Sequence, residues 1–267
     1  MEFILSAPNN STFIYIFNYP IKYYGIILSI ALFCGLFLSE YLVKIKHDEK
    51  TLQTFQDSTL LMVILGIIGA RVFYVLGSLD YYLNNPKEIL MLNHGGISIY
   101  GTIIFGIITL IIYSKIKKIS FLKYADFYAL VLPLCQSIGR FGNFFNQEAY
   151  GKPTNGFIKL FIDENHRLSQ FSDVQYYHPT FLYESILDFV VFVILISIYL
   201  KSKKQKTGLI FALYLILYSV VRIFIENIRI DSVMNLNNIP IAIIISILVF
   251  ITGVFVLFLI NKKCPKK

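Results

Sequence analysis

The chain has 267 residues, of which 56% are hydrophobic and only 15% are charged. Soluble globular domains are usually about 45–50% apolar and about 25% charged, so this composition excludes an ordinary soluble domain and indicates an integral membrane protein. The net charge of +8 does not predict nucleic-acid binding, because the lysines form short clusters between apolar runs, as in loops that set membrane orientation.

Seven apolar runs are long enough to cross a membrane, which takes about 20 mostly apolar residues. The first twenty residues lack a basic segment followed by a continuous apolar one, so no cleavable signal peptide is expected before these runs. The fourth run is the least apolar, because Lys123, Asp126 and Pro133 lie within it. The sequence therefore predicts an all-α integral membrane protein with seven transmembrane helices in a single polytopic domain, 1–267. The runs are 21–42, 59–77, 96–113, 121–139, 180–200, 208–226 and 239–260.

The lysines orient these runs. The connections 43–58, 114–120, 201–207 and 261–267 hold fourteen Lys and Arg residues, whereas 1–20, 78–95, 140–179 and 227–238 hold six over a greater length. The lysine-dense side is cytoplasmic by the positive-inside rule, so the N-terminus is expected outside and the C-terminus in the cytoplasm. Segment 140–179 is then an outer segment. Its prolines and glycines predict a small ordered outer head between spans four and five.

Polar residues of six runs are all expected in the outer half of the membrane or at its outer face. Charged groups inside a membrane are costly and usually face a protein interior or a wet cavity. Each residue alone could form an isolated ion pair or extend its side chain to the membrane interface. Because all of them are expected on the outer side, together they predict a polar cavity there. Its arginines suit a lipid phosphate, which guanidinium groups bind in planar, bidentate fashion. The residues are Tyr24, Arg71, His94, Arg140, His178, Glu184, Tyr218, Arg222, Glu226 and Arg229.

The sixth run ends in a polar stripe, in the stretch YSVVRIFIENIRID. Tyr218, Arg222, Glu226 and Arg229 are spaced i, i+4, i+8 and i+11. On an α-helix this spacing lies on one face, so Arg222 and Glu226 are expected to pair along it.

The stretch GRFGNFFNQEAYG at 139–151 resembles the signature of the bacterial prolipoprotein diacylglyceryl transferases. The stretches YYG, HGG, HPTFLYE and YSVVRIFIENIRI resemble the same family, in the same order, from Tyr24 to Arg229. The resemblance implies a seven-span enzyme of the bacterial inner membrane that uses no metal or organic cofactor. Such an enzyme moves the diacylglyceryl group from phosphatidylglycerol to the lipobox cysteine thiol of a preprolipoprotein, forms a thioether and releases glycerol phosphate.

The resemblance extends to individual positions. Two departures are Gln147, where many members have glycine, and Lys22–Tyr23, where some have His-Trp. Neither alters a charged position of the expected site. The signature's functional positions match Arg140, Asn143, Glu148 and Gly151, the first-span tyrosine matches Tyr24, the HGG histidine matches His94, and the sixth-span positions match Tyr218, Arg222 and Glu226.

The reaction needs a thiolate and a stabilised leaving phosphate. Arg140 and Arg222 are expected to hold the phosphate, and Glu226 to orient Arg222. His94 is a candidate base, since its unperturbed pKa lies near about 6.5, or else an orienting hydrogen-bond donor, and Glu148 is an alternative base. The catalytic set is thus Arg140, Arg222, His94 and Glu226, and the substrate-binding set is Arg140, Asn143, Glu148, Gly151, Tyr24, Tyr218 and Arg229.

Phosphatidylglycerol, preprolipoprotein signal peptides with a lipobox cysteine, and membrane lipids are the expected partners, with no nucleic acid. The expected location is the bacterial inner (cytoplasmic) membrane, crossed several times, with the active site toward the outer leaflet. Three other functions compete with this hypothesis. An outward-facing anion or lipid transporter would need polar residues that continue to the cytoplasmic side, an intramembrane serine protease would need a histidine facing Ser98, and a structural scaffold would not explain the one-sided arginines.

Overall fold

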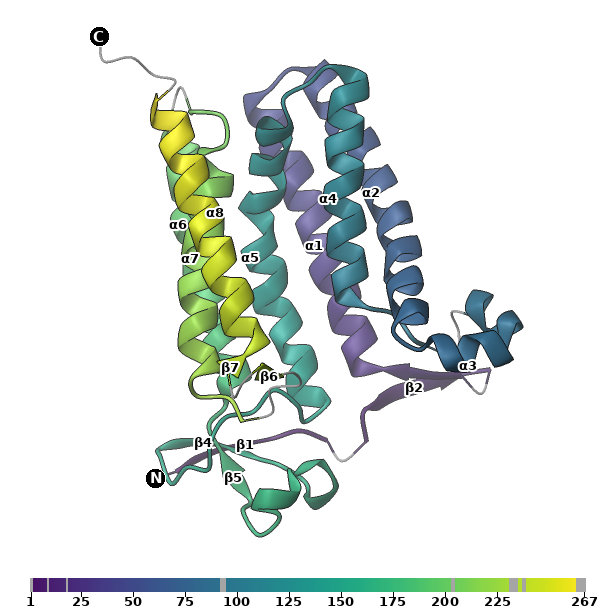
Figure 1. The fold of residues 1–267 in the computed structure, drawn as a ribbon. Coiled ribbons are helices and arrows are strands. Elements are labelled where there is room, and N and C mark those ends of the chain that lie inside the picture. Colours follow the sequence, from purple (N-terminus) through teal and green to yellow (C-terminus); the bar gives the residue numbers. More distant parts are fainter. Residues whose placement is uncertain are drawn as a thin grey trace. The chain divides into compact units, whose positions relative to one another are not determined.

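The computed structural model describes residues 2–8, 10–17, 19–91, 95–202, 205–230, 235–236 and 239–262. His94, a predicted catalytic residue, lies outside the described residues. Long helices dominate the fold, and short strands accompany them (Figure 1). The helices are α1 (Tyr23–Lys46), α2 (Glu49–Leu76), α3 (Leu79–Asn84), α4 (Ile99–Lys117), α5 (Phe121–Phe145), α6 (Thr180–Lys201), α7 (Leu209–Glu226) and α8 (Ile241–Lys262). The strands are β1 (Phe3–Ser6), β2 (Thr12–Ile16), β3 (Tyr19–Lys22), β4 (Ile158–Phe161), β5 (Tyr176–Tyr177), β6 (Asn235–Leu236) and β7 (Ile239–Pro240).

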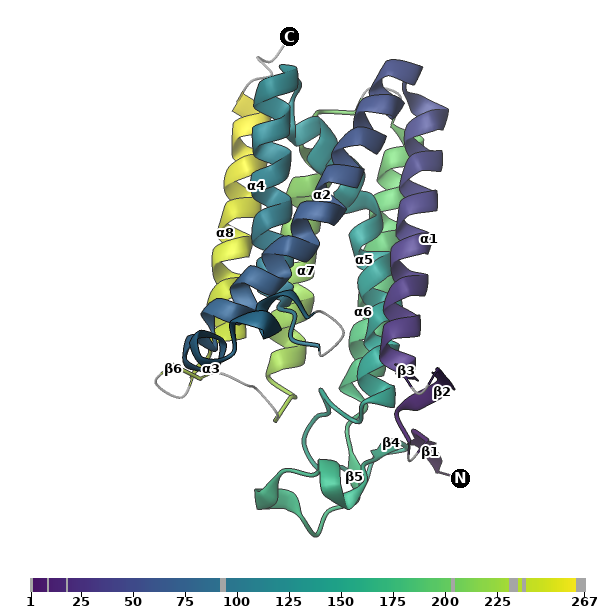
Figure 2. The ribbon, with the colours of Figure 1, turned by 90° about the vertical axis from the view of Figure 1, so that its right-hand side faces the viewer.

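The chain divides into two compact units, residues 40–124 and residues 1–39 with 125–267. In the 40–124 unit, α2 and α4 pack along each other (Figure 2). They approach closely at Gly101, where an added side chain would collide with the backbone carbonyl of Gly69. Small residues at such a crossing let the backbones of two membrane helices come together.

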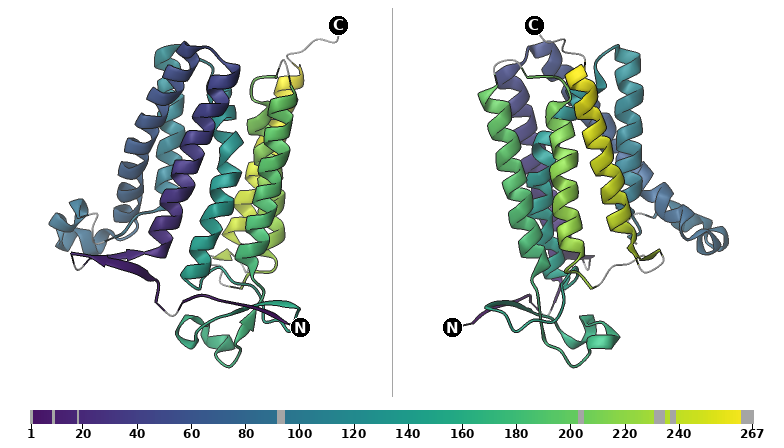
Figure 3. Two further views of the ribbon diagram at one scale, coloured as in Figure 1. Left: turned by 180° about the vertical axis from the view of Figure 1, so that it is seen from behind. Right: turned by 60° about the vertical axis from the view of Figure 1, so that its left-hand side comes forward.

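The other unit is built around α5, α6, α7 and α8. Helix α7 packs against both α6 and α8 (Figure 3). Helices α5 and α6 are joined by buried hydroxyl groups, since the Ser137 and Ser185 side chains lie 3.1 Å apart and Ser185 also donates to the Ser137 carbonyl at 2.9 Å. Helix α1 joins α5 through the Cys135 thiol, which donates to the Ala31 carbonyl at 3.3 Å.

Asp126 connects α5 to the start of α7. Its carboxylate accepts hydrogen bonds from the backbone N–H groups of Gly208, at 2.6 Å, and Phe211, at 2.8 Å. These are among the first N–H groups of a helix, which have no partner within the helix itself. The Asp126 side chain is buried. A carboxylate is costly to bury in an apolar helix, but here it stabilises the start of α7.

A small sheet continues from the ends of α5 and α6. Strand β1 pairs in parallel with β4, and β4 pairs antiparallel with β5. Tyr150, Leu160, Ile162, Tyr177 and Phe181 form a buried cluster that includes residues of β4, β5 and the start of α6. Strands β2 and β3 form a separate hairpin that leads directly into α1.

Within the described residues, six helices are long and apolar enough to cross a membrane, namely α1, α2, α4, α6, α7 and α8. The prediction of a largely helical, multi-pass membrane protein is therefore confirmed. The fourth predicted span, 121–139, corresponds to α5, which is long but too polar to meet the same criterion. Seven spans and the direction of the termini stay predictions. Helices extend beyond the predicted apolar runs, since α2 already begins at Glu49 and α5 continues to Phe145.

Candidate functional site

Two arginines from different helices meet at one carboxylate. Arg140 of α5 donates to Glu184 of α6 at 2.6 Å, and Arg222 of α7 donates to both oxygens of the same carboxylate at 3.2 and 3.4 Å. The Glu184 side chain is 2% exposed, whereas the Arg140 and Arg222 side chains are 19% and 15% exposed. Glu184 is thus buried against the two guanidinium groups, and each arginine side chain keeps an exposed part.

Arg222 has a second acidic partner on its own helix. Its guanidinium lies 2.7 Å from the Glu226 carboxylate, four residues along α7. The predicted pairing of these two residues is confirmed. Glu184 and Glu226 hold the Arg222 side chain from two directions, so its rotamer is fixed before any other anion binds.

The cluster lies at one end of its helices. Arg140 is five residues before the end of α5, Arg222 four residues before the end of α7, and Glu184 four residues after the start of α6. At a rise of 1.5 Å per residue, each lies about 6–8 Å inside its helix end. All three ends lead into the strands and turns of the 146–179 segment or into residues that pair with it.

A chain of side-chain hydrogen bonds leads from Arg140 into the following turn. Arg140 donates to the side-chain oxygen Oδ1 of Asn143 at 3.4 Å, and the side-chain Nδ2 of Asn143 donates to the Glu148 carboxylate at 2.9 Å. The Asn146 amide also donates to Glu148, at 3.3 Å. Two amides therefore hold the Glu148 carboxylate beside Arg140. The structure thus brings three of the predicted residues, Arg140, Asn143 and Glu148, into one network.

Tyr24 packs against the same end of α5. A side chain added at Gly142 would collide with the Tyr24 ring, so this glycine of the signature gives space to a tyrosine.

Gly151 and Arg229 pair with each other through their backbones. They form an isolated antiparallel bridge, and the Gly151 N–H donates to the His178 carbonyl at 2.9 Å. Helix α7 ends at Glu226, so the prediction that Arg229 continues the helical stripe of Tyr218, Arg222 and Glu226 was wrong. The chain leaves the helix there because the backbone of 228–229 pairs with 151–152.

Arg71 has a structural role in the 40–124 unit. Its buried guanidinium donates to the carbonyls of Ile89 at 2.9 Å, Gly95 at 2.5 Å, Gly96 at 2.8 Å and Met91 at 3.2 Å, and also to that of Glu88. A buried cation is tolerated when its donors are satisfied in this way. Arg71 therefore fixes the backbone on both sides of the segment that contains His94.

The comparisons with known proteins agree on one family. The family described as "Prolipoprotein diacylglyceryl transferase" matches residues 11–259. A phosphatidylglycerol–prolipoprotein diacylglyceryl transferase of Clostridium botulinum is 42% identical over 247 residues, which cover 92% of this chain and 95% of the relative. One from Trichormus variabilis is 41% identical over 218 residues, which cover 80% and 77%. This chain belongs to the prolipoprotein diacylglyceryl transferase family.

One departure from the family's signature has a structural explanation. Gln147, where many members have glycine, has a φ of +52°, in the left-handed region that favours glycine. Its amide compensates by binding Asp163 twice, since Nε2 donates to the Asp163 carboxylate at 2.6 Å and Oε1 accepts from the Asp163 N–H at 2.7 Å. In this member of the family, the turn beside the arginines is tied to the segment after β4.

Sequence reasoning placed Glu184 in the polar cavity but gave it no part in the reaction, and it did not consider Asp188. Glu184 stands in HPTFLYE, a stretch shared with the family, but only the structure brings it between Arg140 and Arg222. Asp188 lies one helical turn further on and is completely buried, and neither of its carboxylate oxygens has a hydrogen-bond partner among the described residues. Their spacing of four residues on an apolar helix was the available signal, because two acids on one face need a polar neighbour.

Proposed function

We propose that this protein transfers the diacylglyceryl group of phosphatidylglycerol to the lipobox cysteine thiol of preprolipoproteins. The pair of arginines converging on Glu184 carries this proposal, together with the family to which the chain belongs. In the reaction, the S–H bond of the cysteine breaks and an S–C bond forms to the glyceryl carbon. The C–O bond to the phosphate breaks, and glycerol phosphate leaves with the electron pair of that bond.

The arginines suit the leaving phosphate. Charge grows on the phosphate oxygens as the C–O bond breaks, and guanidinium donors aimed at those oxygens stabilise that charge. The Arg140 and Arg222 side chains are 19% and 15% exposed, so part of each stays accessible. We infer that the phosphate binds to these accessible parts, while Glu184 and Glu226 keep the guanidinium groups in place.

The proton of the thiol needs an acceptor. Glu148 is one candidate, because its carboxylate lies in the same hydrogen-bonded network as Arg140. His94 is the other candidate, and the Arg71 contacts to Gly95 and Gly96 fix the backbone next to it. Asn143, Gly151, Tyr24, Tyr218 and Arg229 complete the proposed substrate-binding set.

We further propose seven membrane spans, with α5 as the fourth. The polar residues that keep α5 from resembling a lipid-exposed span have partners in the protein, as in the Asp126 contacts to α7. The lysine distribution then directs the N-terminus outward and the C-terminus into the cytoplasm. In the inner membrane of a bacterium, this orientation opens the arginine site toward the outer leaflet.

The decisive experiment is thioether formation on a lipobox peptide in vesicles that contain phosphatidylglycerol. Removing one preorganised donor costs about 10²–10³ in kcat, so we expect Arg140→Ala and Arg222→Ala to lose at least about 100-fold. Arg140→Lys should also be severely impaired, because lysine cannot bind bidentately. Lys152→Ala is the control, because this exposed cation lies beside Gly151. Near-normal rates for both Arg140 variants would disprove the phosphate clamp.

An outward-facing anion or lipid transporter is the alternative. Asp188 is one observation in its favour, because a completely buried acid lies further along α6 than the arginine cluster. Phosphate and lipid flux in proteoliposomes separates the two functions. We expect thioether formation without flux, and flux without thioether formation would replace the transferase by the transporter.

A further inference from the structure

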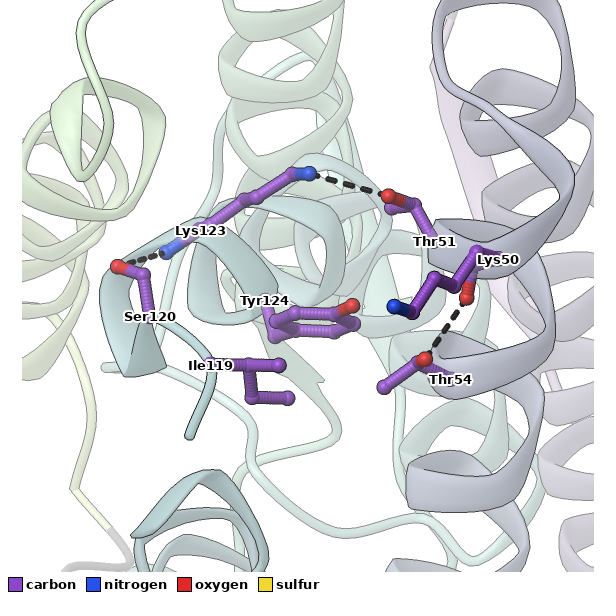
Figure 4. A pocket seen from close by; sticks show the side chains of 7 residues that line it. All are labelled: Lys50, Thr51, Thr54, Ile119, Ser120, Lys123 and Tyr124. Carbon is purple, nitrogen blue, oxygen red and sulfur yellow. Dashed lines mark hydrogen bonds between the residues drawn. The ribbon is translucent and has the colours of Figure 1, made fainter. Parts of the chain in front are cut away.

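A second cationic pocket lies in the 40–124 unit, at the start of α2 and just after the end of α4. This cavity of about 200 Å³ is lined by residues of α2, of the connection after α4, and of the first turn of α5. Its polar lining includes Lys50, Thr51, Ser120 and Lys123, and its apolar lining includes Ile119 and Tyr124. Figure 4 shows the side chains of Lys50, from α2, and Lys123, from the first turn of α5, extending toward the space between these two segments. None of these residues belongs to the site proposed for the transfer reaction.

The two lysines have no carboxylate within ion-pairing distance among the described residues. The half-buried Lys123 ammonium donates to the Thr51 hydroxyl at 3.2 Å, which is a neutral partner. Lys50 lies one residue before Thr51, in the first turn of α2. Lysine is seldom buried unless it is paired, so the half-buried Lys123, with only a neutral partner and with the exposed Lys50 lining the same cavity, favours an anion there.

The backbone adds to this positive potential. Helices α2 and α5, with 28 and 25 residues, both begin at the pocket. The N-terminus of a long helix carries a partial positive charge and favours anions. Asp48 caps α2 by accepting from the Thr51 N–H at 3.3 Å, but its side chain is exposed and therefore well screened by water.

We propose that this pocket binds the phosphate group of an anionic phospholipid from the cytoplasmic leaflet. A cavity of about 200 Å³ accommodates a head group but no acyl chain. Basic pockets between membrane helices on the cytoplasmic side are known binding places for anionic head groups. The orientation proposed above directs these ends of α2 and α4 to that side. Free phosphate has the same binding chemistry, so the test must separate the two sources.

His47 provides a local reporter of the pocket. Burial, followed by the positive charge of Lys123, lowers the pKa of His47; Lys46 lowers it further, while Asp48 raises it. An anion bound at Lys123 would offset the charge of that lysine and so raise the His47 pKa. A local signal is needed because anionic lipid is also expected at Arg140 and Arg222, where it would change global stability.

The experiment follows the His47 imidazole by NMR in protein labelled on histidine and held in a neutral detergent. The chain has 4 histidines, so His47→Gln assigns the signal. The probes are dihexanoyl phosphatidylglycerol, dihexanoyl phosphatidylcholine and inorganic phosphate. We expect phosphatidylglycerol to raise the titration midpoint of His47 by roughly half a pH unit and phosphatidylcholine to leave it unchanged. A weaker rise with inorganic phosphate supports a lipid ligand, whereas an equal or larger rise overturns the lipid in favour of free phosphate.

Matched variants attribute the shift to the pocket. Lys123→Gln and Lys50→Gln should each abolish most of the phosphatidylglycerol response. Lys44→Gln is the control, because it removes an exposed lysine from the last turn of α1 and should keep the response. An unchanged response in both pocket variants, or an equal response to phosphatidylcholine, would overturn the proposal. Thioether formation should persist in all three variants, so this result is independent of the proposed function.

Discussion

At the scale of single residues, Glu184 controls the geometry of the site. It is the only described carboxylate that contacts both Arg140 and Arg222. Breaking a buried ion pair by removing one partner costs about 3–5 kcal/mol, because the other charge stays buried. Glu184 is nearly inaccessible, but both arginines are partly exposed, so we expect the lower end of this range.

We therefore expect Glu184→Gln to lower both the melting temperature and kcat/KM for thioether formation. The variant keeps the shape of the side chain but removes the charge that aligns the two guanidinium groups. Glu164→Gln, a change of an exposed glutamate in the 146–179 segment, serves as the control and should alter neither quantity. Wild-type melting and activity in Glu184→Gln would show that the arginines are oriented by other contacts.

Some contacts of these residues could be predicted from the sequence, and others could not. The pairing of Arg222 with Glu226 was predictable, because both lie on one helix at a fixed spacing. The contact of Glu184 with Arg140 was not, because 44 residues separate them and no local rule brings two helices together. Arg229 was misplaced for a related reason, since the helix ends where long-range backbone pairing with Gly151 begins.

At the scale of elements, Asp126 explains how a polar helix fits among apolar ones. A hydrogen bond contributes about 0.5–1.5 kcal/mol, and Asp126 accepts two of them from the backbone at the start of α7. We expect Asp126→Ala to lower the free energy of unfolding by about 2 kcal/mol, and Asp126→Asn to lower it by less. Thermal unfolding in detergent measures both changes.

The control for this prediction is Asp57→Ala, an exposed aspartate on α2. Equal stability of Asp126→Ala and the control would contradict a capping role.

Helix α5 also shows what hydropathy alone cannot predict. The sequence predicted the long apolar helices close to their observed positions, because an apolar run is a local feature of the sequence. The polar residues of α5 acquire partners only through tertiary contacts, so composition alone left this helix ambiguous.

At the scale of the whole molecule, the number of spans depends on α5. The six other long helices meet the criterion for crossing a membrane. If α5 also crosses, the segments before and after it lie on opposite sides; if it does not, they lie on the same side. Lys117 precedes α5 and Asn155 follows it, and both are exposed. Labelling a cysteine at each position therefore decides the question.

The labelling needs a background without Cys34, Cys135 and Cys264, with transferase activity as the check of its fold. In intact cells, we expect a membrane-impermeant maleimide to label Asn155→Cys at once. Lys117→Cys should react only after the membrane is permeabilised, because the lysine-rich connections are expected in the cytoplasm. Labelling of both cysteines from the same side would remove α5 from the spans. Since Arg140 lies near the end of α5 that leads to Asn155, labelling of Asn155→Cys from outside also directs the arginine site to the outer leaflet.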